Sequence, residues 1–429
     1  MKSSSLLLGR NSIRSSNIML PGSKSISNRV LLLAALSKGE CHLHNVLDSD
    51  DTQYMQKALK FLGIDIKNIN QNEIMIKGNQ GNFTVKEADL FLGNAGTAFR
   101  PLTSVLALQD GYYRIHGTTR MHERPIKDLV DSLQTMGSNI KYLKQSGYPP
   151  LKIEPFKYNG ISTVTVNGNV SSQFLTALLM AAPLLKQEIE IQVIGDLISK
   201  PYIDITLNIM AKFGINIHNH SFKSFTIPNN SEYIAPKSYY IESDASSASY
   251  FLAAAFLTGT PLTLEGMGQD SIQGDIEFAY ELEKLGAHLY MTKQSITLSR
   301  NNKLAIPAFD IDAINIPDAA MTFCIIALVA NGTSTIRNIA SWKVKETDRI
   351  EAMKKELEKL GATIQTTENS IQITPPSIIS PNIAIDTYDD HRMAMCFSLV
   401  SLLNTPIIIN NPECVNKTFP NFFKVLASL

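Results

Sequence analysis

The stretch ELEKLGAHL at residues 281–289 returns almost unchanged as ELEKLGATI at residues 356–364. Each reads as the last turns of an amphipathic helix, then a glycine, then the start of a strand, because glycine readily adopts the left-handed conformation that ends a helix. A repeat with a period of roughly 72 to 77 residues predicts that the chain is built from copies of one supersecondary unit. The same pattern occurs earlier as ALKFLGIDI at 58–66, SLQTMGSNI at 132–140 and NIMAKFGINI at 208–217.

Six polar clusters, each directly before an apolar stretch, recur at a similar spacing. Ser, Asp, Asn and Gly are favoured at the first position of a helix, so each cluster is predicted to begin one. A β-rich stretch follows each time, such as CHLHNVL at 41–47. The unit is therefore helix, strand, helix and one or two strands, repeated six times, which is an α/β pattern. The clusters are GSKSISNR at 22–29, GNAGTAFR at 93–100, NVSSQFL at 169–175, SDASSASY at 243–250, PDAAMTF at 317–323 and DDHRMAM at 389–395.

Six such units in 429 residues predict two domains with three repeats each. The last unit stops at the helical stretch 420–429 with no strand after it, whereas residues 5–20 read as strands without a helix. We therefore expect residues 1–20 to pack with the C-terminal repeats. This gives a discontinuous domain of residues 1–20 plus 242–429, an inserted domain of residues 21–241, and two crossings of the chain.

The composition excludes several classes of function. Lys and Arg number 39, as do Asp and Glu, so the net charge is zero and no global field attracts nucleic acid or an anionic membrane. The four cysteines fit neither a zinc ribbon nor a redox pair. The histidines in HERP and DDHR lack the spacing of a metal motif, so no metal site is expected. No apolar run is long enough to span a membrane or to act as a signal peptide, which predicts a cytoplasmic protein.

Basic residues stand beside the predicted helix starts, as at Lys24, Arg100 and Arg392. A helix N-terminus carries a partial positive charge and exposes unpaired N–H groups, so a cation there is unfavourable unless an anion offsets it. If the helix starts of each domain point the same way, they line a cleft between the domains that suits phosphates and carboxylates. Ordinary helix capping is the alternative for any single cluster.

Six stretches of the chain, in order and with the expected spacing, resemble the 5-enolpyruvylshikimate-3-phosphate synthase family of the enolpyruvyl transferases. The resemblance implies an inverted α/β barrel in each of two domains and an active site between them. It implies enolpyruvyl transfer from phosphoenolpyruvate to shikimate 3-phosphate in the shikimate pathway, inhibition by glyphosate, no cofactor and no metal; we expect a monomer. The stretches are LPGSKSISNRVLLLAAL at 20–36, LGNAGTAFRPL at 92–102, ISKPYIDITL at 198–207, WKVKETDRI at 342–350, DDHRMAMCFSL at 389–399 and KTFPNFF at 417–423.

The resemblance also implies the roles of individual residues. Asp318 would be the base for the 5-hydroxyl, Glu346 would move the proton at C3, and Lys24 would assist. Ser341 stands where the family often has Asn, which puts one substrate contact in doubt. Phosphoenolpyruvate would be bound by Lys24, Gly96, Arg124, Gln173, Arg349, Arg392 and Lys417. Shikimate 3-phosphate would be bound by Lys24, Ser25, Arg29, Ser171, Ser172, Gln173, Ser199, Tyr202, Asp318, Ser341 and Lys345.

The sequence disfavours two alternative functions. The sister enzyme that acts on UDP-N-acetylglucosamine usually carries a reactive cysteine in the region matching residues 120–124, and here no cysteine lies between Cys41 and Cys324. A repeat scaffold or nucleic-acid clamp would need a Lys- and Arg-rich face, which the zero net charge disfavours.

Overall fold

Glycines mark the ends of five helices, as the repeat pattern predicts. The computed structural model describes residues 4–10 and 12–429. All five predicted capping glycines have a positive φ, from 87° to 103°, in which a side chain would be strained. The six polar clusters each lead into a helix, also as predicted. The glycines are Gly63, Gly137, Gly214, Gly286 and Gly361.

The chain divides into two compact units, described here separately. Unit 1 comprises Met1–Pro21 and Glu242–Leu429, and unit 2 comprises Gly22–Ile241. The boundaries expected from the sequence lie within one residue of this division. Residues 1–3 and 11, which belong to the segment 1–20 expected to pack with the C-terminal repeats, lie outside the described residues.

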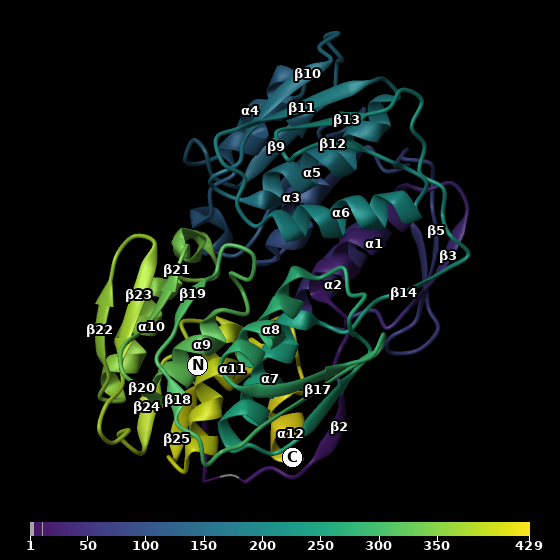
Figure 1. Cartoon of the computed structure of the whole chain (residues 1–429). Helices are drawn as coiled ribbons and strands as arrows, with labels where there is room; N and C mark the ends of the chain where they lie inside the picture. The colour runs from purple at the N-terminus through teal and green to yellow at the C-terminus, as the bar shows by residue number, and fades with distance from the viewer. Residues whose placement is uncertain (1–3, 11) are drawn as a thin grey trace. The chain divides into compact units, whose positions relative to one another are not determined.

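Unit 2 contains three copies of one arrangement (Figure 1). In each four-stranded sheet two strands pair in parallel, and the second of them pairs with an antiparallel hairpin, in the orders β14-β3-β5-β4, β6-β7-β9-β8 and β10-β11-β13-β12. The strands are β3 (Glu40–His44), β4 (Asp65–Asn68), β5 (Ile74–Lys77), β6 (Glu87–Phe91), β7 (Tyr112–His116), β8 (Asn139–Tyr142), β9 (Leu151–Glu154), β10 (Thr163–Asn167), β11 (Ile189–Ile194), β12 (His218–His220), β13 (Ser224–Ile227) and β14 (Ser238–Tyr240). The helices are α1 (Lys24–Leu36), α2 (Asp50–Phe61), α3 (Gly96–Leu106), η1 (Met121–Glu123), α4 (Lys127–Thr135), α5 (Ser172–Ala181), η2 (Ala182–Leu185) and α6 (Lys200–Lys212).

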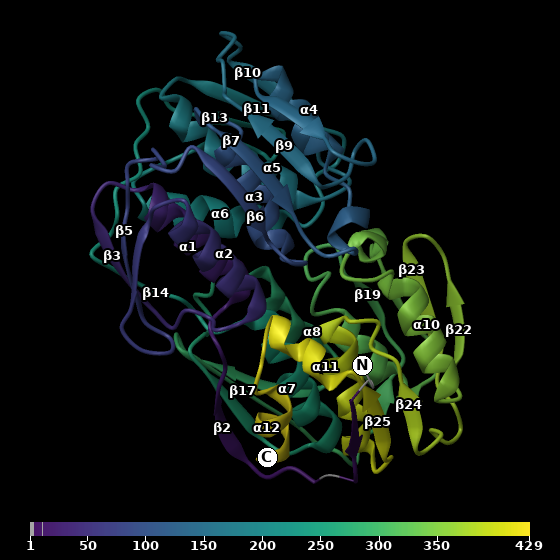
Figure 2. The ribbon, with the colours of Figure 1, turned by 180° about the vertical axis from the view of Figure 1, so that it is seen from behind.

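Two sheets of unit 1 repeat this four-stranded arrangement, in the orders β16-β17-β15-β2 and β19-β21-β23-β22 (Figure 2). The third sheet, β1-β25-β24, has three strands: β24 and β25 pair in parallel, and β1 pairs antiparallel with β25. β18 and β20 form a short parallel pair; in the chain, β18 comes just before β19, and β20 comes just before β21. The strands are β1 (Ser5–Leu8), β2 (Ser16–Met19), β15 (Leu262–Glu265), β16 (Ala287–Met291), β17 (Ser295–Arg300), β18 (Ile306–Pro307), β19 (Asp310–Asp312), β20 (Ala330–Asn331), β21 (Ser334–Arg337), β22 (Thr363–Thr366), β23 (Ser370–Thr374), β24 (Ile383–Ile385) and β25 (Ile407–Asn410). The helices are α7 (Ala245–Thr258), η3 (Gly274–Ile276), α8 (Glu277–Lys284), α9 (Met321–Ala327), η4 (Ala340–Val344), α10 (Arg349–Lys359), α11 (His391–Ser398), η5 (Leu399–Leu403), η6 (Pro412–Lys417) and α12 (Phe422–Ala427).

Three helices of each unit are buried almost along their whole length, namely α1, α3 and α5 in unit 2 and α7, α9 and α11 in unit 1. A helix that is apolar on all sides must be buried, which explains their central place. The helices between them in sequence, such as α2 and α10, have one apolar face and cover the outside. The helix starts that the sequence marks with polar clusters are therefore the starts of the central helices.

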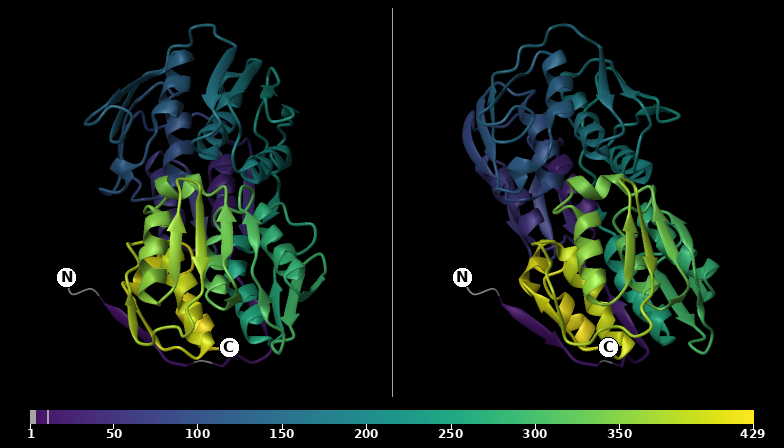
Figure 3. Two further views of the ribbon diagram at one scale, coloured as in Figure 1. Left: turned by 60° about the vertical axis from the view of Figure 1, so that its left-hand side comes forward. Right: turned by 90° about the vertical axis from the view of Figure 1, so that its left-hand side faces the viewer.

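The N-terminal segment supplies two strands to unit 1, as predicted. β1 pairs antiparallel with β25 and completes the last sheet, and Figure 3 shows this first strand beside the C-terminal part of the chain. β2 pairs parallel with β15. In four repeats the parallel strand directly precedes its central helix, but β2 is followed by α1 of unit 2, and β14, which pairs with β3, is followed by α7 of unit 1. Because the chain crosses between the units twice, each unit contains the strand that directly precedes the first central helix of the other unit.

Two details differ from the expectation. The strand after Gly214 begins at His218 rather than directly after the glycine. Short 3-10 helices, such as η3 and η4, follow several strands and had no counterpart in the expected pattern. Within the described residues, no helix combines the length and the apolar character that crossing a membrane requires.

Candidate active site

Seven charged residues of unit 1 meet where α9, α10 and α11 begin, and we call them the charge cluster. Arg349, the first residue of α10, is its centre. Its guanidinium donates to Asp390 Oδ2 at 2.8 Å, to Glu346 Oε2 at 2.9 Å and to Asp318 Oδ1 at 3.1 Å. Because this side chain is almost fully buried and bound to three carboxylates, its position is fixed. The members are Asp318, Lys345, Glu346, Arg349, Asp390, Arg392 and Lys417.

Asp318 is shared by three cations. Besides Arg349, Lys345 Nζ lies 3.2 Å from Oδ1, and Arg392 donates to Oδ2 at 3.0 Å. Burial alone would raise the pKa of Asp318, but Arg392, Lys345 and Arg349 outweigh it and hold this pKa well below its ordinary value. The carboxyl is therefore ionised at neutral pH, and it is a weak base for as long as these cations surround it.

Glu346 stands between Arg349 and a lysine from a different part of the chain. Lys417 Nζ, at the end of η6, lies 3.9 Å from Glu346 Oε1. The fold thus brings together residues that the sequence separates by about 70 positions, and it does so at the edge of the same cluster that holds Asp318.

Two acidic residues of unit 1 were not foreseen as part of a site. Asp390 accepts from the backbone N–H of Arg392 as the N-cap of α11, which was expected, but it is also a counter-ion of Arg349. Asp275, in η3, is buried and accepts from the hydroxyl of Ser246 in the first turn of α7. Burial and the nearby charge of Asp318 raise the pKa of Asp275 to about 6. Neither contact follows a local sequence spacing, so no motif could have indicated it.

In unit 1 the cations beside the helix starts have counter-ions within the chain. Cations beside helix starts were expected to require a bound anion. In unit 1 carboxylates of the chain itself, chiefly Asp318 and Asp390, stand beside Arg392 and Arg349. The position of the cations is therefore explained without a ligand, and anion binding has to compete with these internal ion pairs.

In unit 2, side chains join the starts of four helices. Arg29 of α1 donates to Thr206 Oγ1 at 2.9 Å and to the Tyr202 carbonyl at 3.2 Å in α6, and to Thr176 Oγ1 at 3.3 Å in α5. Asn28 donates to Thr97 Oγ1 of α3 at 2.7 Å. The starts of α1, α3, α5 and α6 thus lie together, and the predicted residues Ser25, Ser171, Ser172, Gln173 and Ser199 belong to these same helix starts.

Arg29 is buried, with 5% of its surface exposed. Its Nη1 also donates to the Ser25 carbonyl at 3.0 Å. Burial lowers its pKa to about 10, so it stays charged at neutral pH. Through these contacts Arg29 links α1, α5 and α6. This positioning role comes in addition to the binding role that the resemblance implies.

Two guanidinium groups lie beside Gly96, the first residue of α3. A Cβ built on Gly96 would lie 2.6 Å from Arg100 Nη1 and 2.9 Å from Arg124 Nη2. Arg124 itself donates to the side-chain oxygen of Asn94 at 3.0 Å and Arg100 donates to the Pro125 carbonyl at 3.3 Å. The missing side chain at Gly96 therefore leaves room next to two positive charges and the helix N-terminus.

The remaining predicted residues occupy these surroundings. Lys24, the first residue of α1, lies 3.6 Å from Asp51 of α2. Ser199, the N-cap of α6, has a left-handed backbone with φ 54°, which is uncommon for serine. Ser341 lies in η4, and the neighbouring Trp342 donates to the Pro317 carbonyl at 2.6 Å, which anchors η4 beside the start of the Asp318 segment.

Comparison with known proteins decides the family. A family model described as EPSP synthase (3-phosphoshikimate 1-carboxyvinyltransferase) matches residues 11–426. The chain belongs to the EPSP synthase family.

Curated relatives of this EPSP synthase family member cover almost its whole length. A protein of Neisseria meningitidis serogroup B named 3-phosphoshikimate 1-carboxyvinyltransferase is 54% identical over 97% of this chain and 96% of its own. A protein of the same name from Paraburkholderia phytofirmans is 54% identical over 98% of both chains. The solved EPSP synthase of Acinetobacter baumannii superposes with a TM-score of 0.81 at 24% identity, covering 99% of this chain and 98% of its own. The predicted fold class is thereby confirmed.

Proposed function

We propose that this member of the EPSP synthase family transfers the enolpyruvyl group of phosphoenolpyruvate to the 5-hydroxyl of shikimate 3-phosphate. The observation that carries the proposal is the family match over residues 11–426, together with relatives of that name at 54% identity. These names favour this reaction over transfer to UDP-N-acetylglucosamine. The reaction belongs to the route towards chorismate and the aromatic amino acids.

The charges support binding of two doubly charged substrates. Phosphoenolpyruvate carries a phosphate and a carboxylate, and the planar guanidinium of arginine suits both. We assign the groups beside Gly96, with Arg124, and the cations of the charge cluster to phosphoenolpyruvate. We assign Lys345 and the serines at the helix starts of unit 2 to shikimate 3-phosphate. The phosphoenolpyruvate set is Lys24, Gly96, Arg124, Gln173, Arg349, Arg392 and Lys417, and the shikimate 3-phosphate set is Lys24, Ser25, Arg29, Ser171, Ser172, Gln173, Ser199, Tyr202, Asp318, Ser341 and Lys345.

The proposed chemistry has two steps. The 5-hydroxyl oxygen bonds to C2 of phosphoenolpyruvate and loses its proton to Asp318, while C3 gains a proton from Glu346, which gives a tetrahedral ketal. The ketal then loses phosphate from C2, which takes up the proton held by Asp318, and the new methyl group returns a proton to Glu346, which restores the double bond. Cationic side chains, Lys24 among them, stabilise the departing phosphate.

The strongly lowered pKa of Asp318 fits this role only if substrate binding changes it. An anion that binds Lys345 and Arg392 competes for the charges that now stabilise the ionised carboxylate. Its pKa then rises towards the range in which it can accept a proton. The base would thus be activated by the arrival of the substrates.

Phosphate release from phosphoenolpyruvate tests the function. We expect release only when shikimate 3-phosphate is present, and none with UDP-N-acetylglucosamine as the acceptor. Asp318→Asn should lower kcat by about 100-fold or more, because general base catalysis contributes on that order. Equal release with and without shikimate 3-phosphate, or release with the UDP sugar alone, would contradict the proposal.

Two neighbouring lysines provide a matched test of the substrate assignment. Lys345 contacts Asp318, whereas Lys343 lies 3.6 Å from the exposed Glu368. Lys345→Met should raise the KM for shikimate 3-phosphate by roughly tenfold, the worth of about one charge-assisted hydrogen bond. Lys343→Met should leave it unchanged. The same effect from both would mean that the assignment to the 3-phosphate is wrong.

We also propose the compartment and the oligomeric state of the protein. The four cysteines are free and buried, which suits a reducing compartment, and we place the protein in the cytoplasm. We expect a monomer, which sedimentation equilibrium with and without substrates would test.

A further inference from the structure

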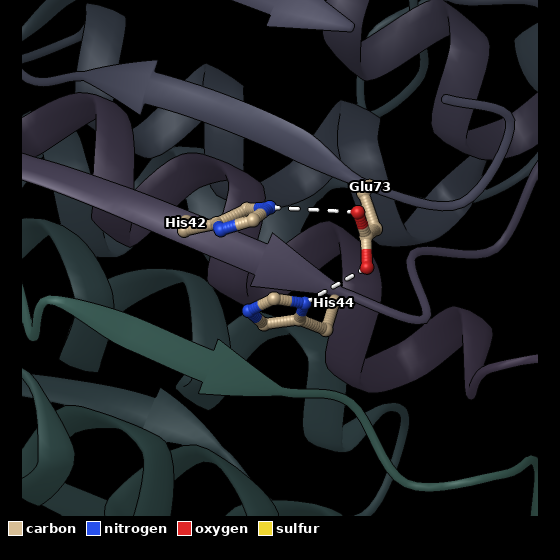
Figure 4. A group of neighbouring side chains, drawn as sticks. All are labelled: His42, His44 and Glu73. Carbon is tan, nitrogen blue, oxygen red and sulfur yellow. Dashed lines mark hydrogen bonds and ion pairs between the residues drawn. The ribbon is translucent and has the colours of Figure 1, made fainter. Parts of the chain in front are cut away.

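Two histidines and a glutamate gather on the outer face of the first sheet of unit 2. Successive residues of a strand point to opposite faces, so Cys41 and Leu43 of β3 are buried while His42 and His44 share the other face. β3 and β5 run antiparallel with His42 opposite Met75 and Leu43 opposite Ile74, which brings Glu73, just before β5, beside His44. Figure 4 shows both rings turned towards the Glu73 carboxylate.

The three side chains lie close to the geometry of a ligand set. Glu73 Oε1 lies 3.1 Å from His44 Nδ1, and Oε2 lies 3.8 Å from His42 Nε2. One atom from each residue can be chosen so that all three lie within 4.8 Å of one another. Ligands around a tetrahedral zinc ion lie about 3.3 Å apart, given bonds of about 2.0 to 2.1 Å. Small rotations of half-exposed side chains would close this difference.

Two further observations favour a ligand set over a simple ion pair. The Nε2 atom of His42 is shielded from solvent and makes no hydrogen bond within the described chain, while it faces the Glu73 carboxylate at 3.8 Å. The amide of Asn70 donates to Glu73 Oε2 at 2.9 Å and orients the carboxylate from outside. Such outer hydrogen bonds are typical of metal-binding carboxylates.

We propose that His42, His44 and Glu73 bind one divalent transition-metal ion, with zinc as the reference ion and solvent at a remaining position. Two imidazoles and one carboxylate suit zinc, nickel and copper, whereas magnesium prefers oxygen ligands and is excluded. The site is separate from the residues assigned to the substrates. It ties β3 to the segment before β5, so the bound ion stabilises unit 2 through binding to the folded state alone.

The chain contains its own control. His218 and His220 also alternate along a strand, β12, and both are exposed. In the described part of the chain, no third His, Cys, Asp or Glu completes a ligand group with them. This pair therefore reports what two surface histidines contribute without a carboxylate.

Competition with a chromophoric chelator for zinc tests the proposal on the purified, untagged full-length protein. We expect one zinc ion per chain, and a rise in the unfolding temperature when zinc is added. His42→Ala and Glu73→Gln should each weaken binding by at least about tenfold, because loss of a ligand costs no less than loss of an outer partner. The double variant H218A/H220A should bind zinc as the parent does.

The variants should unfold at the same temperature as the parent without zinc, which separates loss of the site from loss of the fold. The proposal is overturned if the parent takes up no zinc at micromolar concentration. It is also overturned if Glu73→Gln binds as tightly as the parent, or if H218A/H220A removes the binding, because then any exposed histidine pair would be enough.

Discussion

Asp275 is a carboxyl whose protonation is controlled by burial. Its pKa of about 6 lies above the ordinary value of about 3.9, so the folded protein holds this proton more tightly than the unfolded chain does. As the pH rises from about 4 to 6, the unfolded chain releases the proton first and stability is lost. The full cost is therefore present above pH 6, and it is absent below about pH 4.

Asp275→Asn removes this cost and should stabilise the protein at pH 7 by about 3 kcal/mol, at 1.36 kcal/mol per pKa unit. Urea unfolding at pH 7 and at pH 4 measures the difference, which should vanish at the lower pH. Asp270, an exposed partner of Lys293, provides the control. Asp270→Asn should change neither value, and a pH-independent gain in Asp275→Asn would show that the buried charge is not its cause.

Gly96→Ala tests the proposed phosphoenolpyruvate site, because it adds a single carbon atom there. An alanine Cβ would lie closer to Arg100 Nη1 and Arg124 Nη2 than ordinary contacts allow, so both guanidiniums must shift. Helix α3 itself tolerates alanine, which is a better helix former than glycine. We expect kcat/KM for phosphoenolpyruvate to fall by about 100-fold, as for a 1 Å displacement of a catalytic group, with shikimate 3-phosphate binding largely kept.

Steady-state kinetics with each substrate varied in turn measure this effect. Gly9→Ala is the matched control, because a Cβ there would meet nothing within 4 Å. An equal loss of affinity for both substrates in Gly96→Ala would contradict the assignment of this pocket.

The sequence indicates residues that belong to local patterns. It does not indicate residues that come close to each other only in the folded chain. Asp318 and Asp390 stand in the helix-start clusters that the repeat pattern marks, whereas the role of Asp318 as a base was implied by the resemblance. Asp51 beside Lys24 and Asp275 beside Ser246 pair across separate elements, and no spacing reports such contacts. His42 and His44 were overlooked because alternation on a strand, rather than a helical spacing, places them together.

At the scale of elements, the joined helix starts of unit 2 depend on Arg29. Its guanidinium makes four hydrogen bonds, to the Ser25 and Tyr202 carbonyls and to the hydroxyls of Thr176 and Thr206. A lysine keeps the charge, but it cannot reproduce this planar set of donors. Loss of two such bonds should destabilise the protein by about 3 kcal/mol in Arg29→Lys.

Urea unfolding of Arg29→Lys measures this cost, and the KM for shikimate 3-phosphate should rise in the same variant. Arg114→Lys is the control, because Arg114 forms an exposed pair with Asp89 at 2.8 Å. Such a pair is worth about 0 to 1 kcal/mol. A parent-like stability in Arg29→Lys would mean that packing, rather than these hydrogen bonds, holds the helix starts together.

The helix boundaries were the most predictable elements, because glycine and the capping residues act locally. The strands were predictable as a class, but their partners were not. The exchange of β2 and β14 between the units depends on which parallel neighbour each strand finds, and β3 and β15 are comparably apolar candidates. Only the need for strands in the last repeat indicated that the N-terminal segment packs with the C-terminal repeats.

At the scale of the whole molecule, the division into units carries a folding prediction. Unit 2 is one continuous segment, Gly22–Ile241, and β14 lies within it, so each of its three sheets is complete without unit 1. A segment of this size with its own core can fold alone. We expect the isolated fragment 22–241 to unfold cooperatively and to release no phosphate from phosphoenolpyruvate, because Asp318 and Glu346 are absent.

Removal of β14 tests whether this strand stabilises the sheet that it forms with β3, β5 and β4. In a fragment of residues 22–237, β3 loses its parallel partner and presents an open edge, which favours association with other chains. We expect this shorter fragment to be less stable in urea and to form oligomers in size-exclusion chromatography, whereas 22–241 stays monomeric. Equal behaviour of both fragments would mean that β14 is a linker between the units, because a strand that completes a sheet cannot be removed without a change in stability.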